Sequence, residues 1–294
     1  MNQYICRYCR QPSDPGAPTC PMCGAPVDIK TVVSDTGWVE QPAIRDMARI
    51  QFGQSHCEIA GTTVPVAEFT LAPDDAIYFS HHVLLWTDPA TRLNTMKMAG
   101  AWNRKLAGLP LVMMEAFGPG HLALSDNHAG EVIALPLQAG QHMWVREHRF
   151  LCATARINYT WHNTGVYYET GSGDDREYHY PMGQLGDVFT AQGGPGLLLL
   201  HSPGNTFIRD LKHGESLIIQ PSALLYRDTS VRVNLHLEYP KNRGFAFWSN
   251  RWSYRNILAK VHGPGRVAVQ SVYERPEDYE IITGHPYDTT TRHW

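Results

Sequence analysis

The feature that most constrains this chain is a segment that occurs three times. The copies begin at Leu71, Leu137 and Leu211 and read LAPDDAIYF, LQAGQHMWV and LKHGESLII. The alignment continues without a gap, so that VLLW at 83–86 matches RFLC at 149–152 and ALLY at 223–226. Each copy alternates short apolar runs with turn residues, as strands joined by tight turns do. The chain is therefore expected to fold from three similar β units.

A second landmark, Gly-Pro-Gly, follows each copy in the same order. It occurs at 118–120, 194–196 and 263–265, and an apolar or alternating run comes after each occurrence. No window shows a sustained helical period, and the 25 glycines and 20 prolines indicate many tight turns, which excludes a helical bundle. Three units that each lack a complete core are expected to associate around a pseudo-threefold axis, giving an all-β barrel or prism.

Composition limits the classes of function. Hydrophobic residues make up 43% of the chain and charged residues 18%, which excludes a disordered or fibrous protein. The formal charge of −3 offers no basic excess for holding nucleic acid or an anionic membrane by long-range attraction. No apolar run approaches the roughly 20 residues of a membrane span, and the N-terminus has no hydrophobic signal region. The expectation is a cytoplasmic protein without a transmembrane segment.

Four of the six cysteines lie within the first 23 residues, as two C-x-x-C pairs. Cys6 pairs with Cys9 and Cys20 with Cys23, with ten residues between the pairs. Two thiolates three positions apart on a tight turn can reach one ion, and two such turns complete a tetrahedral shell. The spacing predicts structural zinc on these four ligands. Iron, as in a rubredoxin, is the rival ion, and two disulfides are the alternative without a metal.

The domain boundaries follow from these patterns. We expect a four-cysteine zinc ribbon at 1–30, a polar linker at 31–45, a three-repeat β barrel domain at 46–273 and a polar C-terminal tail at 274–294. The ribbon is too short to fold by apolar burial, so metal binding would supply most of its folding free energy. Its few basic residues argue against nucleic acid as a partner and favour protein docking or a purely structural role.

Taken in order, the motifs resemble the altered inheritance of mitochondria protein 24 family, formerly a domain of unknown function. The set that carries the resemblance, within 46–273, is LAPDDAIYF, GPGHLALS, LPLQAGQHMWV, GGPGLLLL, LKHGESLII and GPGRVAVQS. The resemblance implies a β barrel of three similar sheets, like the fold of the tryptophan RNA-binding attenuation protein, and it implies no catalytic residues. This chain departs from the family pattern by its zinc ribbon and by a tyrosine-rich insertion at 166–180, which is expected to form a hairpin.

No catalytic constellation emerges from the residues themselves. The 15 histidines include no H-x-H pair, and the chain has no G-x-S-x-G elbow, phosphate loop or dinucleotide fingerprint. His236 and Glu238 would share one face of a strand, which is more often a surface contact than a metal site. Cys57 and Cys152 lie in apolar, strand-like contexts and are expected to be small buried hydrophobes. We therefore expect a protein that is not an enzyme.

Aromatic and basic residues gather at matching places in two units, each time before a Gly-Pro-Gly landmark, and in the tyrosine-rich insertion. Tryptophan, tyrosine and arginine are typical anchors of protein interfaces. Such residues could instead cover one end of the barrel, and lipid or nucleic acid is a further alternative. The interface candidates are Trp102, Arg104, Trp248, Arg251, Trp252, Tyr167 and Tyr178.

The sequence therefore predicts a non-enzymatic binding or scaffold protein. It would form a homo-oligomer through its β domain, bind a protein partner and use the zinc ribbon for docking. A small-ligand-binding or catalytic barrel of cupin-like type is the alternative, and RNA binding by fold analogy is weaker. Peripheral contact with a membrane stays open.

Overall fold

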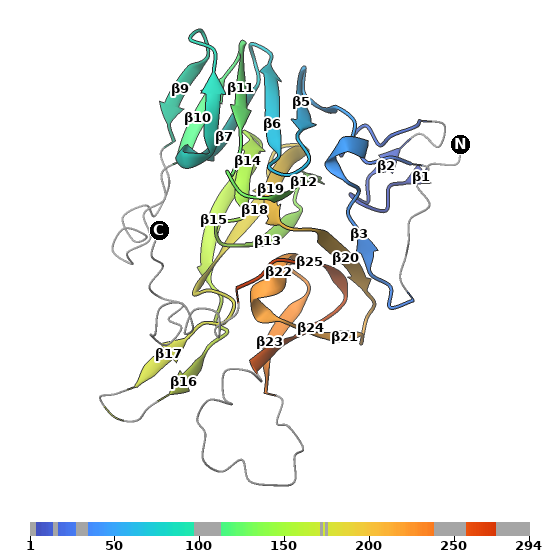
Figure 1. The fold of residues 1–294 in the computed structure, drawn as a ribbon, viewed down its shortest axis with the longest axis vertical. Helices are drawn as coiled ribbons and strands as arrows, with labels where there is room; N and C mark the ends of the chain where they lie inside the picture. The colour runs from blue at the N-terminus through green and yellow to red at the C-terminus, as the bar shows by residue number, and fades with distance from the viewer. Residues whose placement is uncertain are drawn as a thin grey trace. The chain divides into compact units, whose positions relative to one another are not determined.

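The computed structural model describes residues 4–13, 17–27, 35–96, 113–170, 173, 176–237 and 257–274. These residues form β-strands and three-residue 3-10 helices, with no α-helix among them (Figure 1). The predicted all-β class is therefore confirmed. Within the same residues, no helix is long and apolar enough to cross a membrane.

The chain divides into two compact units. The first holds the described residues up to His142 together with 148–159 and 189–206. The second holds 143–147, 160–188 and the described residues from Phe207 onward.

The first unit contains two large antiparallel sheets. The five-stranded sheet has the order β4 (Ile50–Phe52), β5 (Ser55–Ala60), β6 (Val66–Leu71), β11 (Gly120–Leu124) and β8 (Leu84–Thr87). The six-stranded sheet has the order β12 (Gly130–Leu137), β19 (Gly196–Pro203), β14 (Phe150–Thr154), β7 (Ala76–Ser80), β10 (Met113–Phe117) and β9 (Arg92–Thr95). The shorter elements are β1 (Tyr4–Ile5), β2 (Pro12–Ser13), β3 (Val39–Glu40), η1 (Ile44–Asp46) and η2 (His81–Val83).

Strands of the second unit lie mainly in one larger and one smaller sheet. Six strands of the larger sheet follow the order β15 (Ile157–Asn163), β18 (Leu185–Ala191), β13 (His142–Arg146), β22 (Leu224–Asp228), β25 (Gly265–Gln270) and β20 (Thr206–Leu211). The smaller sheet has the order β21 (Ser216–Ile219), β24 (Ile257–His262) and β23 (Arg232–Leu237). The remaining elements are the hairpin β16 (Tyr168–Thr170) with β17 (Glu177–His179), and η4 (Pro221–Ala223).

The strands pair in the same way in three successive stretches of chain, which we call segment one (66–124), segment two (130–203) and segment three (206–270). Apart from the inserted hairpin of segment two, each segment contains six strands. In each, the second strand pairs with the fifth and the fifth with the fourth, while the first pairs with the sixth and the sixth with the third. Arrangement of the three segments around a threefold axis stays a prediction.

Burial in the first unit follows the strand patterns. β5 alternates buried and more exposed residues, as expected where one face of a sheet packs inward, whereas every residue of β14 is buried. Phe150 of β14 stacks on Phe189 with 4.9 Å between ring centroids and lies 5.5 Å from the ring of Tyr78. Cys57 and Cys152 are fully buried, as predicted, and burial raises the pKa of both thiols.

Candidate metal centre and exposed aromatic hairpin

The two C-x-x-C pairs fold into the same tight turn. Arg10 donates its backbone N–H to the carbonyl of Cys6 at 2.7 Å, and Gly24 donates in the same way to Cys20 at 2.8 Å. The residue that ends each turn is left-handed, with φ of 63° at Arg10 and 73° at Gly24. Glycine adopts this conformation without strain, which explains why Gly24 follows the second pair. The turns place both cysteines of each pair on one side.

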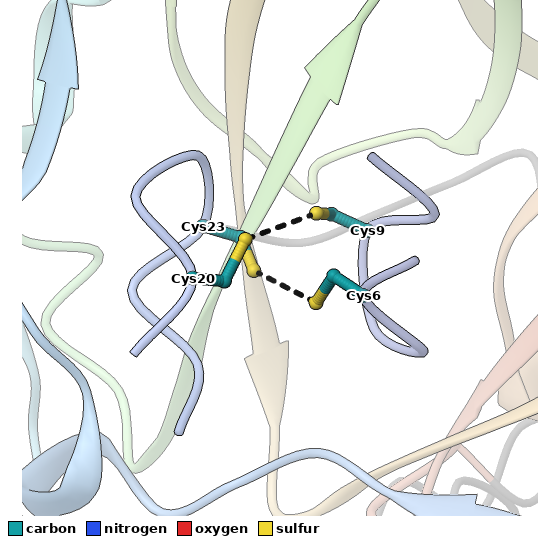
Figure 2. A group of neighbouring side chains, drawn as sticks. All are labelled: Cys6, Cys9, Cys20 and Cys23. Atoms are coloured by element: carbon teal, nitrogen blue, oxygen red, sulfur yellow. Dashed lines mark hydrogen bonds between the residues drawn. The ribbon is translucent and has the colours of Figure 1, made fainter. Parts of the chain in front are cut away.

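The four thiols converge from these turns on one point (Figure 2). Their sulfur atoms all lie within 4.8 Å of one another, and all four side chains are buried. The distance from Cys6 Sγ to Cys23 Sγ is 3.8 Å and that from Cys9 Sγ to Cys20 Sγ is 3.7 Å. A tetrahedron with metal–sulfur bonds of about 2.3 Å has edges of about 3.8 Å. The cluster therefore fits one ion held by four thiolates.

The four thiols shift one another's pKa values through the contacts between their sulfur atoms. Bonds from Cys23, and then from Cys6 and Cys9, lower the pKa of the Cys20 thiol far below its usual value. The neighbouring thiols, Cys20 first, raise the pKa of the Cys23 thiol. The hydroxyl Oγ of Ser13 lies 3.2 Å from the Cys20 sulfur. A thiolate is the form that binds a metal, so an ion held by all four sulfur atoms would displace the protons that these thiols carry.

Hydrogen bonds hold the four-cysteine segment against the sheets of the first unit. Ala48 donates its backbone N–H to the carbonyl of Gly24 at 2.7 Å. The buried side chain of Gln11 donates to the carbonyl of Pro136 at 3.4 Å and accepts from Gln138 Nε2 at 2.6 Å. Sequence reasoning missed these glutamines, because their partners are more than 120 positions away in the chain. The ribbon thus packs on strand β12.

A cavity of about 320 Å³ opens beside the second C-x-x-C turn. Its lining comes from Met22 of that turn and from the ends of strands in both sheets of the first unit. Leu197, Pro195 and Pro136 give it apolar walls, while Asp74, Asp75 and Arg156 contribute charge. This hollow is the feature that a small-molecule site would require.

A second polar cluster surrounds a buried histidine. His201 Nδ1 lies 3.0 Å from the carboxylate of Asp126, and His128 Nδ1 lies 3.2 Å from the same oxygen atom. Hydrogen bonding and charge from His201 outweigh burial and lower the pKa of Asp126. The sequence offered no signal for this cluster, because 75 positions separate Asp126 from His201. Within the described residues, the four cysteines form the one group of three or more such side chains whose ligand atoms lie close enough to share an ion.

The tyrosine-rich insertion forms the predicted hairpin, with β16 antiparallel to β17. Tyr167 and Tyr178 are each 44% exposed, and their ring centroids lie 5.5 Å apart. The ring centroid of Tyr180 lies 5.8 Å from that of Tyr167, so the three tyrosine rings form one cluster. The candidates outside the described residues are Trp102, Arg104, Trp248, Arg251, Trp252 and the Glu238 partner of His236.

Comparison with solved structures supports the fold. A crystal structure of a protein from Streptococcus pyogenes matches with a TM-score of 0.56 and 19% sequence identity, covering 78% of this chain and 98% of that one. No curated protein matches the chain. The model of the family described as "Mitochondrial biogenesis AIM24" matches residues 57–272, which span the six-strand pattern of all three segments. The chain therefore belongs to the AIM24 family, with a four-cysteine cluster that could hold a metal ion ahead of the family domain.

Proposed function

We propose that this chain is a non-enzymatic scaffold protein that assembles with itself and with a protein partner, and that zinc holds its N-terminal ribbon. The closed four-cysteine centre carries the proposal. Its ligand shell is complete without substrate or water, and such sites support structure, whereas catalytic zinc keeps an open position. Because the ribbon packs on β12 through Gln11, the ion would stabilise a surface of the first unit.

Zinc is the ion that we assign to this site. Four thiolates in a tetrahedron suit zinc, and iron is the second choice for the same ligand set. Free thiols at this spacing also agree with a reducing compartment, which supports a cytoplasmic location. A disulfide pairing would leave neither a four-sulfur tetrahedron nor a ligand shell.

The exposed parts of the ribbon and the hairpin are the proposed contact surfaces. Tyr167 and Tyr178 offer large rigid rings that bury much area at small cost in side-chain entropy. On the ribbon, Ile5 is exposed next to the charged Arg7 and Arg10. The predicted Trp and Arg anchors at 102–104 and 248–252 belong to the same proposal.

Light scattering and affinity capture test this function together. The wild-type chain should be larger than a monomer in solution and should retain a reproducible protein partner. A Tyr167→Ser, Tyr178→Ser variant should lose the partner while keeping its melting temperature, because both rings are exposed. Tyr273→Ser is the matched control, since Tyr273 is 38% exposed outside the hairpin. A monomeric wild type without a partner would overturn the proposal.

A second candidate function rests on the cavity beside Met22. Its volume of about 320 Å³ lies at the lower end for ligand sites, so a small-ligand-binding barrel of cupin-like type is the alternative. A thermal-shift screen of metabolites would favour it if one compound stabilised the wild type and failed to stabilise Arg156→Ala. RNA binding is supported only by analogy with the fold.

A further inference from the structure

Two junctions join successive segments of the chain, and both use the same register. In the first unit, the third strand of segment two, β14, pairs antiparallel with the second strand of segment one, β7. In the second unit, β22 of segment three pairs antiparallel with β13 of segment two. The opposed residues at the first junction are Phe79 with Cys152, Tyr78 with Ala153 and Ile77 with Thr154. Those at the second are Val145 with Tyr226, Trp144 with Arg227 and Met143 with Asp228.

The sequence alignment makes these two registers equivalent. Phe79 aligns with Val145, and Cys152 aligns with Tyr226, so the same pair of positions meets at both junctions. The rule that follows is simple. The second strand of one segment pairs with the third strand of the next, with fixed partners.

One second strand and one third strand remain without a partner of the other kind. β8, the third strand of segment one, is the last strand of its five-stranded sheet, and β21, the second strand of segment three, is the last of its three-stranded sheet. Among the residues that the structure describes, neither has a ladder partner on its outer side. Unpaired strand edges are templates for pairing with another strand.

Exposure marks the same two edges. Leu85 and Trp86 of β8 are 56% and 41% exposed, and Ile218 of β21 is 48% exposed. The aligned side chains at the two paired junctions are at most 5% exposed, and these are Leu151, Cys152, Leu225, Tyr226, Tyr78 and Trp144. Positions whose side chains are buried at the two paired junctions are therefore exposed on the unpaired edges of β8 and β21.

We infer that β21 of one copy of this chain pairs antiparallel with β8 of a second copy, in the register of the two internal junctions. Ile219 would lie opposite Trp86, Ile218 opposite Thr87 and Leu217 opposite Asp88. The inference rests on the proposed self-assembly and names its surface. Each copy carries one edge of each kind, so the contact is head-to-tail and either closes into a ring or extends.

Disulfide capture between two different variants tests the register. Directly opposed residues of an antiparallel pair have Cα atoms about 4.5–5.5 Å apart, within reach of a disulfide. Thr87→Cys chains mixed with Ile218→Cys chains and oxidised by glutathione disulfide should give a covalent dimer that neither variant forms alone to the same extent. Thr87→Cys mixed with Leu217→Cys is the control, because a shift of one residue points the side chain to the other face.

Each outcome decides a separate point. A dimer in the first mixture, at least tenfold above the control mixture, supports the inference. A cross-link found only within single chains of a Thr87→Cys, Ile218→Cys double variant would overturn the role of a second copy. If light scattering finds an oligomer and no cross-link forms, the proposed assembly stands and this surface is wrong. If the wild type is a monomer, the proposed assembly and the pairing of β21 with β8 of a second copy are both wrong.

Discussion

At the scale of single residues, the four thiols give the sharpest expectation. Purified wild-type protein should carry one zinc ion per chain, and Cys20→Ser should lose it, because a hydroxyl does not replace a thiolate as a zinc ligand and only three sulfur ligands would remain. Elemental analysis after desalting measures the ratio. Cys57→Ala removes a thiol buried away from the cluster and should keep its zinc. Full zinc in Cys20→Ser would refute the ligand assignment.

The buried carboxyl of Glu131 makes stability depend on pH. Burial raises its pKa to about 7 from 4.5, although the backbone N–H of Thr206 donates to its Oε2 at 2.9 Å. A carboxyl whose folded pKa is raised destabilises the fold as pH rises from the unfolded pKa through the folded one. The wild type should therefore lose stability between pH 5 and pH 8 because of this group.

Replacing Glu131 with glutamine tests that expectation. Glu131→Gln keeps an acceptor for Thr206 without a charge, so its melting temperature at pH 8 should exceed that of the wild type by a few degrees, about 1 kcal/mol for a chain of this size. At pH 5 the two should agree closely. Glu68→Gln, on the exposed side of β6, is the control. Equal slopes with pH for wild type and Glu131→Gln would refute the assignment.

The C-x-x-C spacing predicted that the four cysteines come together, but it could not predict the hydrogen bonds that hold this segment on the sheets. The C-x-x-C spacing is local, and its meaning depends only on turn geometry. The contact of Gln11 with Pro136 and the contact of Asp126 with His201 depend on which strands meet. The sequence around Gln11 and the sequence around Asp126 do not distinguish these residues from ordinary polar residues of a protein surface.

At the scale of elements, the Gly-Pro-Gly landmarks have a packing explanation. A Cβ on Gly118 would collide with the carbonyl of Ala72, and one on Gly263 would lie 2.5 Å from the carbonyl of Lys212. Ala72 and Lys212 occupy aligned positions in segments one and three. In segments one and three, the first glycine of the landmark therefore lets the chain pass close to the turn between the first two strands of the same segment, whereas in segment two a Cβ on Gly194 would meet the side chain of Arg156.

Gly118→Ala should consequently destabilise the fold by about 2 kcal/mol or more, because the obstructing atoms belong to the backbone and cannot turn aside. Chemical denaturation measures the difference. Gly140→Asn is the comparison, since nothing lies within 4 Å of a Cβ there and asparagine tolerates its φ of 82°. A loss at Gly118 no larger than the loss at Gly140 would contradict the packing explanation.

Strand positions were predictable from the repeat, and the breaks between strands were not. The aligned runs at 76–80, 142–146 and 216–219 are all strands. The 3-10 helices at His81–Val83 and Pro221–Ala223 interrupt two segments at aligned positions. Three-residue helices without a side-chain cap leave no periodic pattern in a sequence.

At the scale of the whole molecule, the repeat predicts that the strands pair in the same way in each segment. Identical pairing in three segments follows from aligned apolar positions, because a shift of one residue would expose every buried side chain of a strand. The grouping into two compact units has no such local signal. The grouping depends on which second strands pair with which third strands of other segments, and a sequence repeat does not distinguish these pairings.

Independence of the β domain from the ribbon is the expectation that belongs to this scale. A shortened chain from Asp46 to Tyr273 keeps all six strands of every segment and both internal junctions. It should unfold cooperatively, at a lower temperature than the full chain, because β12 loses the contacts of Gln11 with Pro136 and Gln138. Chelating the metal from the full chain should lower its melting temperature by no more than the shortening does, since most of the ribbon's folding free energy comes from the ion. Circular dichroism against temperature measures both. A shortened chain that melts without cooperativity would make the ribbon part of the core and move the domain boundary toward the N-terminus.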